Sequence, residues 1–207
     1  MKRLALFGAS GHGKVVADAA LAGGWGSVEF FDDAWPQCNR NGPWPVTGDS
    51  AALMARLLDF QGVLVSIGNC AVRWDKHQAL LAAGAPLVTV VHPAAAVSRH
   101  ATLGLGTVVM AGAVVNIDAI VGQAGIVNTG ATVDHDCLLG DAVHICPGAH
   151  LAGSVRVGCC SWVGVGAAVK QGMSIGDRVM VGAGAVVVRP VPDAQTVVGN
   201  PARLLEA

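Results

Sequence analysis

VVMAGAVVNIDAIVGQAGIVNTGATV, residues 108–133, carries an aliphatic residue at every sixth position. The spacing continues in both directions, and all 17 residues taken six apart from Val91 to Val187 are Val, Leu or Ile. An α-helix repeats every 3.6 residues and a half-buried strand every two, so neither requires this period. We call these positions the aliphatic ladder; their regular recurrence indicates a chain wound into stacked coils.

A second period lies on top of the first. Gly104, Gly122, Gly140, Gly158 and Gly176 are 18 residues apart, and each follows a ladder residue. Three hexads per coil are typical of a triangular parallel β-helix, in which the ladder points inward and small residues serve the tight bends. The sequence therefore predicts a β-helix over residues 91–207.

The composition excludes several classes of protein. Hydrophobic residues make up 53% of the 207 residues, and a stacked core accounts for this. The aliphatic run Val108–Val115 ends at Asn116, well short of the roughly 18 apolar residues that a membrane span needs. A net charge of −1 without a basic run argues against nucleic acid or anionic lipid as the main partner.

The first residues and the cysteines bear on where the protein works. MKRLALFGAS begins like a signal peptide, but its apolar part is short and continues into GHGKVV, so we expect a cytoplasmic protein. The six cysteines form no CxxC pair, which favours reduced and mostly buried thiols.

Residues 1–90 show a different pattern. Strands are predicted at 4–10, 28–34 and 63–69, and helices at 15–24 and 71–84. Because strands and helices alternate, this segment is expected to form a small, parallel, Rossmann-like α/β domain.

The carboxyl edge of that sheet is a candidate ligand site. The turn GASGHG (8–13) has GxxGxG spacing instead of the GxGxxG typical of NAD binding, yet its amides and the following helix start suit a pyrophosphate. Asp32 and Asp33 end the second strand, where an acid commonly contacts a ribose or base. IGN (67–69) and Arg73 follow the neighbouring strand. A purely structural role for the glycine turn is the alternative.

VDHDC (133–137) is a polar cluster within the β-helix. His135 follows ladder residue Val133 by two positions, so it is expected at a corner, pointing outward. A carboxylate from Asp134 or Asp136 on one ring nitrogen would fix the tautomer and raise the basicity. Gly153, one coil later, would leave open space beside the ring and an N–H for an oxyanion. The pattern predicts a base beside a cavity.

The ladder, together with VVGNPARLL (197–205), resembles the hexapeptide-repeat acyltransferases. GASGHGKVVAD (8–18), the IGNxxxR stretch (67–73) and NTGATVDHDC (128–137) are similar to the branch of nucleotide-sugar acetyltransferases related to the bacillosamine and perosamine N-acetyltransferases and the sialic acid O-acetyltransferases. The resemblance implies a left-handed β-helix and a homotrimer with active sites between subunits. It also implies acetyl-CoA on the β-helix and a nucleotide-sugar on the N-terminal domain.

The same resemblance implies roles for individual residues. His135 would be the general base and Asp136 its partner. Nucleotide-sugar contacts would come from Ser10, Gly11, His12, Asp32, Asp33, Gly68, Asn69 and Arg73, with Asn128 near the acceptor sugar. Acetyl-CoA would contact His144, Val165 and Ala183, and the stacking above adds Gly153 to this set. For His144 the alternative is a surface pair with Trp162, one coil later.

We therefore expect an enzyme that moves an acetyl group from acetyl-CoA to the 4-amino group of a UDP- or GDP-linked 4-amino-4,6-dideoxy sugar, for surface glycan synthesis. Transfer would be direct, without a metal or a covalent intermediate on Cys137 or Cys146. The alternatives are a sialic acid O-acetyltransferase, a zinc enzyme of carbonic-anhydrase type, and a non-catalytic sugar-nucleotide-binding module. The zinc enzyme needs three converging histidines, whereas His144 and His150 should lie on different faces.

Overall fold

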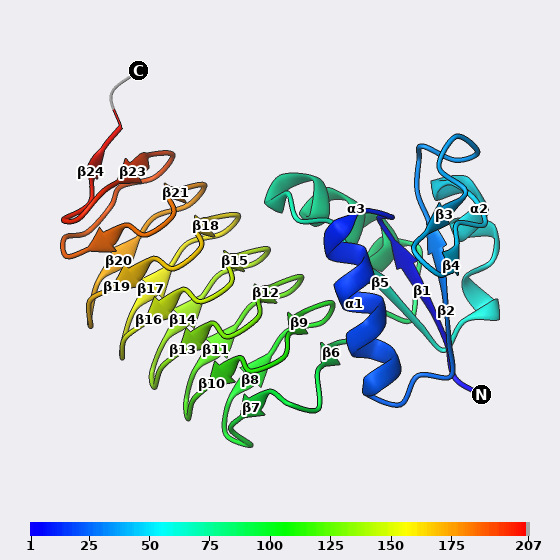
Figure 1. Cartoon of the computed structure of the whole chain (residues 1–207), viewed down its shortest axis with the longest axis horizontal. Coiled ribbons are helices and arrows are strands. Elements are labelled where there is room, and N and C mark those ends of the chain that lie inside the picture. Colours follow the sequence, from blue (N-terminus) through cyan, green and yellow to red (C-terminus); the bar gives the residue numbers. More distant parts are fainter. Residues whose placement is uncertain (206–207) are drawn as a thin grey trace. The chain divides into compact units, whose positions relative to one another are not determined.

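The computed structural model describes residues 1–205 and divides the chain into two compact units, Met1–Pro93 and Ala94–Ala207 (Figure 1). The predicted boundary, after residue 90, lies three residues before this division. Within residues 1–205, none of the helices has the length and apolar character needed to span a bilayer.

The first unit contains a parallel three-stranded sheet in the order β2-β1-β5. Its strands are β1 (Arg3–Phe7), β2 (Ser27–Phe31) and β5 (Gly62–Val65), and its helices are α1 (Gly11–Ala22), α2 (Ser50–Ala55) and α3 (Cys70–Ala82). The short elements β3 (Arg40–Asn41), β4 (Trp44–Pro45), η1 (Leu57–Asp59) and β6 (Val90–Val91) complete the unit. The strands end earlier than predicted, so the polar residues after them lie in loops at the carboxyl edge.

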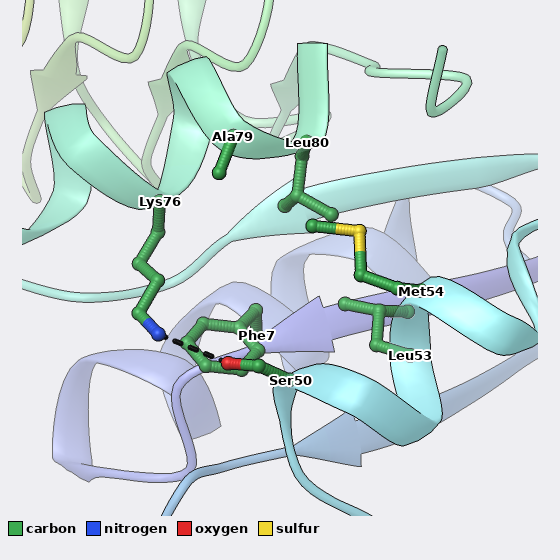
Figure 2. A pocket seen from close by; sticks show the side chains of 7 residues that line it. All are labelled: Phe7, Ser50, Leu53, Met54, Lys76, Ala79 and Leu80. Atoms are coloured by element: carbon green, nitrogen blue, oxygen red, sulfur yellow. Dashed lines mark hydrogen bonds between the residues drawn. The ribbon is translucent and has the colours of Figure 1, made fainter. Parts of the chain in front are cut away.

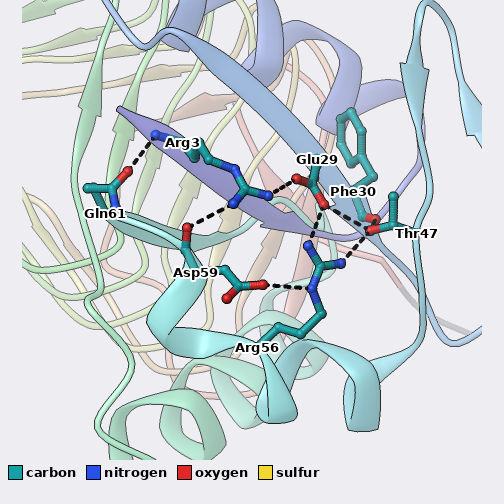
Figure 3. Close-up of polar contacts among 7 residues, drawn as sticks. All are labelled: Arg3, Glu29, Phe30, Thr47, Arg56, Asp59 and Gln61. Atoms are coloured by element: carbon teal, nitrogen blue, oxygen red, sulfur yellow. Dashed lines mark hydrogen bonds and ion pairs between the residues drawn. The ribbon is translucent and has the colours of Figure 1, made fainter. Parts of the chain in front are cut away.

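An ion cluster ties the sheet to the segment after α2 (Figure 3). The Glu29 carboxylate accepts hydrogen bonds from Arg3 and from Arg56, and Arg56 also pairs with Asp59 at 3.0 Å. The Arg56 guanidinium lies 5.3 Å from the centroid of the Phe60 ring. Burial would raise the pKa of Glu29, but the hydrogen bonds from the two arginines hold it below its usual value. The cluster joins β1, β2 and η1, and we assign it a structural role.

The second unit is a parallel β-helix of two-residue strands arranged in three sheets. The first sheet contains β7 (Ala96–Val97), β10 (Val114–Val115), β13 (Thr132–Val133), β16 (His150–Leu151), β19 (Ala168–Val169) and β22 (Val186–Val187). The second contains β8 (Thr102–Leu103), β11 (Ile120–Val121), β14 (Leu138–Leu139), β17 (Arg156–Val157) and β20 (Ser174–Ile175). The third contains β9 (Val108–Val109), β12 (Ile126–Val127), β15 (His144–Ile145), β18 (Trp162–Val163), β21 (Met180–Val181) and β23 (Thr196–Val198), closed by the antiparallel β24 (Arg203–Leu204).

The register confirms the 18-residue coil, since Val115 pairs with Val133 and Val133 with Leu151. The ladder residue is the second residue of each strand, and it is buried at every position from Val109 to Val187. These side chains form one continuous core. Val91, at the start of the ladder, differs from these positions in being 37% exposed.

Two sets of residues shape the corners. The glycines repeated every 18 residues have no left-handed φ; a Cβ on Gly122 would stand 2.7 Å from the main-chain carbon of Gly140 in the next coil. Their role is close approach of the coils, not the bend that the sequence predicted. The bends use a left-handed residue at every sixth position: Gly106, Gly112, Asp118, Ala124, Gly130, Asp136, Ala142, Gly148, Ser154, Cys160, Gly166, Gly172, Arg178 and Gly184.

Candidate active site

His135 lies at the corner that follows β13. The main-chain N–H of His135 donates to Oδ1 of Asp134 at 2.8 Å. The ring atom Nδ1 lies 2.7 Å from Oδ2 of Asp136. Because a carboxylate only accepts, Nδ1 carries the proton and Nε2 is the basic atom. The hydrogen bond with Asp136, helped by the charge of Asp134, raises the pKa of His135 above its ordinary value. The side chain is 55% exposed, so this base can be reached from outside the chain.

The imidazole rests on the backbone of Gly153. A Cβ at that position would fall among the ring atoms Cε1, Nε2 and Nδ1 of His135. The space that the sequence predicted beside the imidazole is therefore occupied by the imidazole itself. The neighbouring Ser154 donates its N–H to the carbonyl of His135 at 2.9 Å, which joins the two coils.

Asn116 is part of this corner although the sequence analysis did not single it out. Its Nδ2 donates to Oδ1 of Asp134 at 2.8 Å. The 18-residue spacing could have revealed this contact, because Asn116 precedes Asp134 by one coil and must stack against it.

The neighbouring thiols are unsuited to nucleophilic catalysis. Cys137 is fully buried and donates its Sγ hydrogen to the carbonyl of Ala152 at 3.2 Å. Burial raises the pKa of the Cys137 thiol, which disfavours the reactive thiolate. Cys146 is also buried.

A second polar cluster lies on the third sheet. Oδ1 of Asn128 accepts the N–H of Thr129 at 2.8 Å, which fixes the orientation of the amide. Nδ2 of Asn128 therefore donates to Nε2 of His144 at 3.1 Å, and the His144 ring lies 4.1 Å from that of Trp162. His144 is only 4% exposed, so its interpretation as a surface residue is wrong. Since His135 follows the first sheet, Asn128 and His135 belong to different corners.

Val165 and Ala183 lie one coil apart at the corner after the third sheet. Both are exposed, and Val165 accepts the N–H of Gly184 at 2.8 Å. Glycine is the left-handed residue throughout this corner, and at Gly148 and Gly166 the Cβ position is open space. The corner thus presents its main chain outward, which suits a ligand bound through backbone groups.

In the first unit, the glycine turn is joined to the end of β2 by Asp32. Its carboxylate accepts the N–H of Ala9 at 2.7 Å and that of Ala34 at 2.9 Å. Ser10 and Gly11 are exposed at the start of α1. His12 beside them is half-buried, and burial together with the charge of Arg73 lowers its pKa to about 4. His12 is therefore neutral near pH 7.

Arg73 and Asn69 shape the loop after β5. Arg73 is 1% exposed, and its Nη1 donates to the carbonyls of Ile67 at 2.8 Å and Gly68 at 2.7 Å. Asn69 uses its side chain to cap α3, accepting the N–H of Val72 at 3.0 Å. The structure places Arg73 beneath the loop, where it supports Gly68, and its contact with a nucleotide-sugar stays a prediction.

Asp33 joins α2 and α3. Its Oδ1 accepts the Oγ hydrogen of Ser50 at 2.6 Å, and its Oδ2 pairs with Nζ of Lys76 at 2.6 Å. Burial would raise the pKa of Asp33, but the hydrogen bonds from Lys76 and Ser50 hold it below its usual value. Lys76 and Ser50 also line a cavity of about 100 Å³ whose other walls are apolar (Figure 2). Sequence reasoning missed both residues, because only the packing of α2 against α3 brings them to Asp33.

No group of three histidine, cysteine or acidic side chains suited to a metal ion occurs within the part of the chain described here. His144 and His150 lie on the third and first sheets.

The chain is similar to proteins of known activity. Residues 3–80 match the family model described as the PglD N-terminal domain. The acetyltransferase domain of PglB from Neisseria gonorrhoeae is 44% identical with a TM-score of 0.93, and the match covers 99% of this chain and 100% of that one. The same domain has been solved in complex with acetyl coenzyme A.

Two further relatives carry substrate names. PerB from Caulobacter crescentus, solved with CoA and GDP-perosamine, is 38% identical with a TM-score of 0.94, over 100% of this chain and 98% of that one. The UDP-N-acetylbacillosamine N-acetyltransferase of Bacillus subtilis is 37% identical over 115 residues, which span 51% of this chain and 50% of that protein.

Proposed function

The chain belongs to the family of hexapeptide-repeat nucleotide-sugar acetyltransferases, and from this premise we propose that it transfers the acetyl group of acetyl-CoA to an amino group of a nucleotide-linked sugar. The observation that carries the proposal is the His135–Asp136 pair, a base with its proton fixed on Nδ1 and its Nε2 available. The similarity to PerB, over almost the full length of both chains, supports an amino-sugar as the acceptor.

The reaction follows from this geometry. Nε2 of His135 removes a proton from the sugar amine as the amine nitrogen attacks the thioester carbon. The C–N bond forms, the C–S bond breaks, and the departing thiolate takes the proton from the imidazolium. The N–H of Gly153, whose main chain touches the imidazole, is the donor that we assign to the developing oxyanion. No covalent intermediate is needed, in keeping with the buried thiol of Cys137.

We assign the substrate to the 4-amino-4,6-dideoxy sugars linked to UDP or GDP, bound by the first unit at Ser10, Gly11, Asp33 and Gly68. Acetyl-CoA is assigned to the β-helix, at Gly153 and the outward main chain of Val165 and Ala183. A homotrimer with active sites between subunits is supported by exposed apolar side chains such as Ile117, Ile120 and Val165, which a partner subunit would cover. The cytoplasm, where acetyl-CoA and nucleotide-sugars are made, is the expected compartment.

The first test is release of free thiol from acetyl-CoA by the purified protein with three acceptors: a UDP-4-amino-4,6-dideoxy sugar, GDP-perosamine and a sialic acid. We expect turnover with one amino-sugar. Turnover with sialic acid alone would show that the enzyme is an O-acetyltransferase instead of an N-acetyltransferase. His135→Ala should lower kcat by roughly 10²–10⁴ without loss of acetyl-CoA binding. His150→Ala, on the outer surface of β16, is the control and should keep its turnover. Near-normal turnover of His135→Ala would contradict the role given to His135.

A further inference from the structure

We propose that Asn116 and Asp134 are positioning residues for the catalytic base: Asn116 holds Asp134, and Asp134 in turn sets the orientation and the basicity of His135. The inference rests on the proposed function, in which Nε2 of His135 is the base. Asn116 has not been assigned a role by the similarity to other proteins, and its contact with Asp134 is visible only in the stacked coils.

Two hydrogen bonds to one shared acceptor connect the three residues. Asn116 and Asp134 follow the paired ladder residues Val115 and Val133, so their side chains lie directly above one another. A single oxygen, Oδ1 of Asp134, accepts Nδ2 of Asn116 and the N–H of His135, each at 2.8 Å. Asn116 thus limits the rotation of the carboxylate, and the carboxylate fixes the backbone of His135.

The hydrogen bonds through Asp134 add to the other contacts that hold His135 in place. Asp136 binds Nδ1, the Ser154 N–H binds the carbonyl, and the ring rests on Gly153. The N–H side of His135 is tied to the preceding coil through Asn116, and Asp136 is tied to the same coil by donating its own N–H to the carbonyl of Ile117 at 3.3 Å. The corresponding corner positions in the other coils carry Ser98, Ala152, Lys170 and Val188, so the Asn–Asp pair is confined to the coil of His135.

The negative charge of Asp134 also affects the pKa of the His135 imidazole. The N–H of His135 and the amide of Asn116 lower the pKa of Asp134, so the carboxylate remains ionised while the imidazole titrates. Its negative charge favours the imidazolium and adds to the effect of Asp136. Among the groups around the imidazole, Gly153 and Ser154 above are uncharged, and Asp118 stands one coil below Asp136.

Two variants separate charge from position. Asp134→Asn keeps an oxygen that can accept the His135 N–H but removes the charge. The imidazolium is then less stabilised, so the pKa of His135 should fall. Because the neutral ring is the active form, the acidic limb of the kcat/KM profile should move to lower pH. Asn116→Ala keeps the charge but frees the carboxylate, so kcat should fall about tenfold with the KM for acetyl-CoA unchanged.

The measurements are the NMR titration of the His135 ring and the pH profile of turnover, each compared with Ser98→Ala. Ser98 caps its own corner by accepting the His100 N–H at 3.2 Å, one coil from Asn116. The proposal is overturned if Asp134→Asn leaves the His135 titration unchanged, or if Asn116→Ala keeps the kcat of the Ser98→Ala control. If wild-type protein acetylates none of the acceptors, the proposed function fails, while the NMR titration still decides the effect of Asp134 on His135.

Discussion

The corner after β13 shows how neighbouring residues prepare one imidazole for proton transfer. Asp136 has φ 59°, a left-handed conformation that few residues besides Gly, Asn and Asp adopt readily, and from there its carboxylate reaches Nδ1 of His135. The bend of the chain and the tautomer of the base are therefore set by the same residue. Asp136 combines a structural and a chemical function, because it stands at one of the left-handed positions that recur every six residues from Gly106 to Gly184.

Gly153 is the residue whose replacement should affect this imidazole most directly. In Gly153→Ala the new Cβ would overlap the His135 ring, which must then leave its hydrogen bond with Asp136. We expect kcat to fall by about 10², since small misplacements of a reacting group can have that effect. Steady-state kinetics measures the fall, and thermal unfolding shows whether the fold is kept.

The control for that substitution is Gly172→Ala, at the same corner one coil later. Gly172 has φ +68° and open space at its Cβ position, so alanine adds strain without touching His135. This variant should unfold at a lower temperature but keep its kcat. Equal losses of kcat in both variants would show that Gly153 acts through general stability and not through the imidazole.

At the scale of elements, the β-helix uses glycine in two physically distinct ways. Along one corner, Gly104, Gly122, Gly140 and Gly158 allow neighbouring coils to touch through their backbones. Along another, Gly148 and its equivalents adopt a left-handed φ with free space around them. The first kind avoids a collision and the second avoids local backbone strain.

This distinction predicts unequal effects of the same substitution. A Cβ on Gly158 would lie 2.5 Å from both the amide nitrogen of Asp177 and the main-chain carbon of Gly176, so two coils must separate. We expect Gly158→Ala to cost about 3 kcal/mol or more in the free energy of unfolding. Gly148→Ala meets no atom and should cost only about 1–2 kcal/mol. Urea unfolding of both variants measures the difference, and similar losses would contradict the assignment.

At the scale of the whole molecule, the two units have separate candidate ligand sites. The first unit gathers Ser10, Gly68 and Asp33 at the carboxyl edge of its sheet, while the second carries His135 on the β-helix. Each unit has its own continuous core, so a substitution in one is not expected to disturb the packing of the other. Binding of nucleotide-sugar and of acetyl-CoA should therefore be separable by mutation.

Lys76→Met tests this separation. It removes the cation that pairs with Asp33 at 2.6 Å while keeping an unbranched side chain against Phe7. Without it the Asp33 carboxylate is less well held, so the KM for the nucleotide-sugar should rise about tenfold. The KM for acetyl-CoA should stay the same. Asp75→Asn, an exposed neighbour on α3, is the matched control. A parallel rise in both KM values would argue against separate sites.

Much of the β-helix could be predicted because its contacts join residues at short, fixed separations in the sequence. The period of six predicted the β-helix and its buried ladder, since every coil repeats the same short environment. The residues alone left Asp134 and Asp136 both open as the partner of the His135 ring, the family resemblance favoured Asp136, and the structure has Asp136 on Nδ1. Gly153 could be placed beside His135 from the 18-residue stacking alone.

The sequence by itself thus determined the β-helix, the α/β unit and the identity of the candidate base. Only the tertiary structure decided that Arg73 supports a loop from below, that His144 is buried against Trp162, and that Lys76 and Ser50 surround Asp33. The physical reason is that a repeat brings its neighbours together at a known spacing. In the α/β unit, contacts between residues such as Asp33 and Lys76 depend instead on how whole elements pack, which no local pattern records.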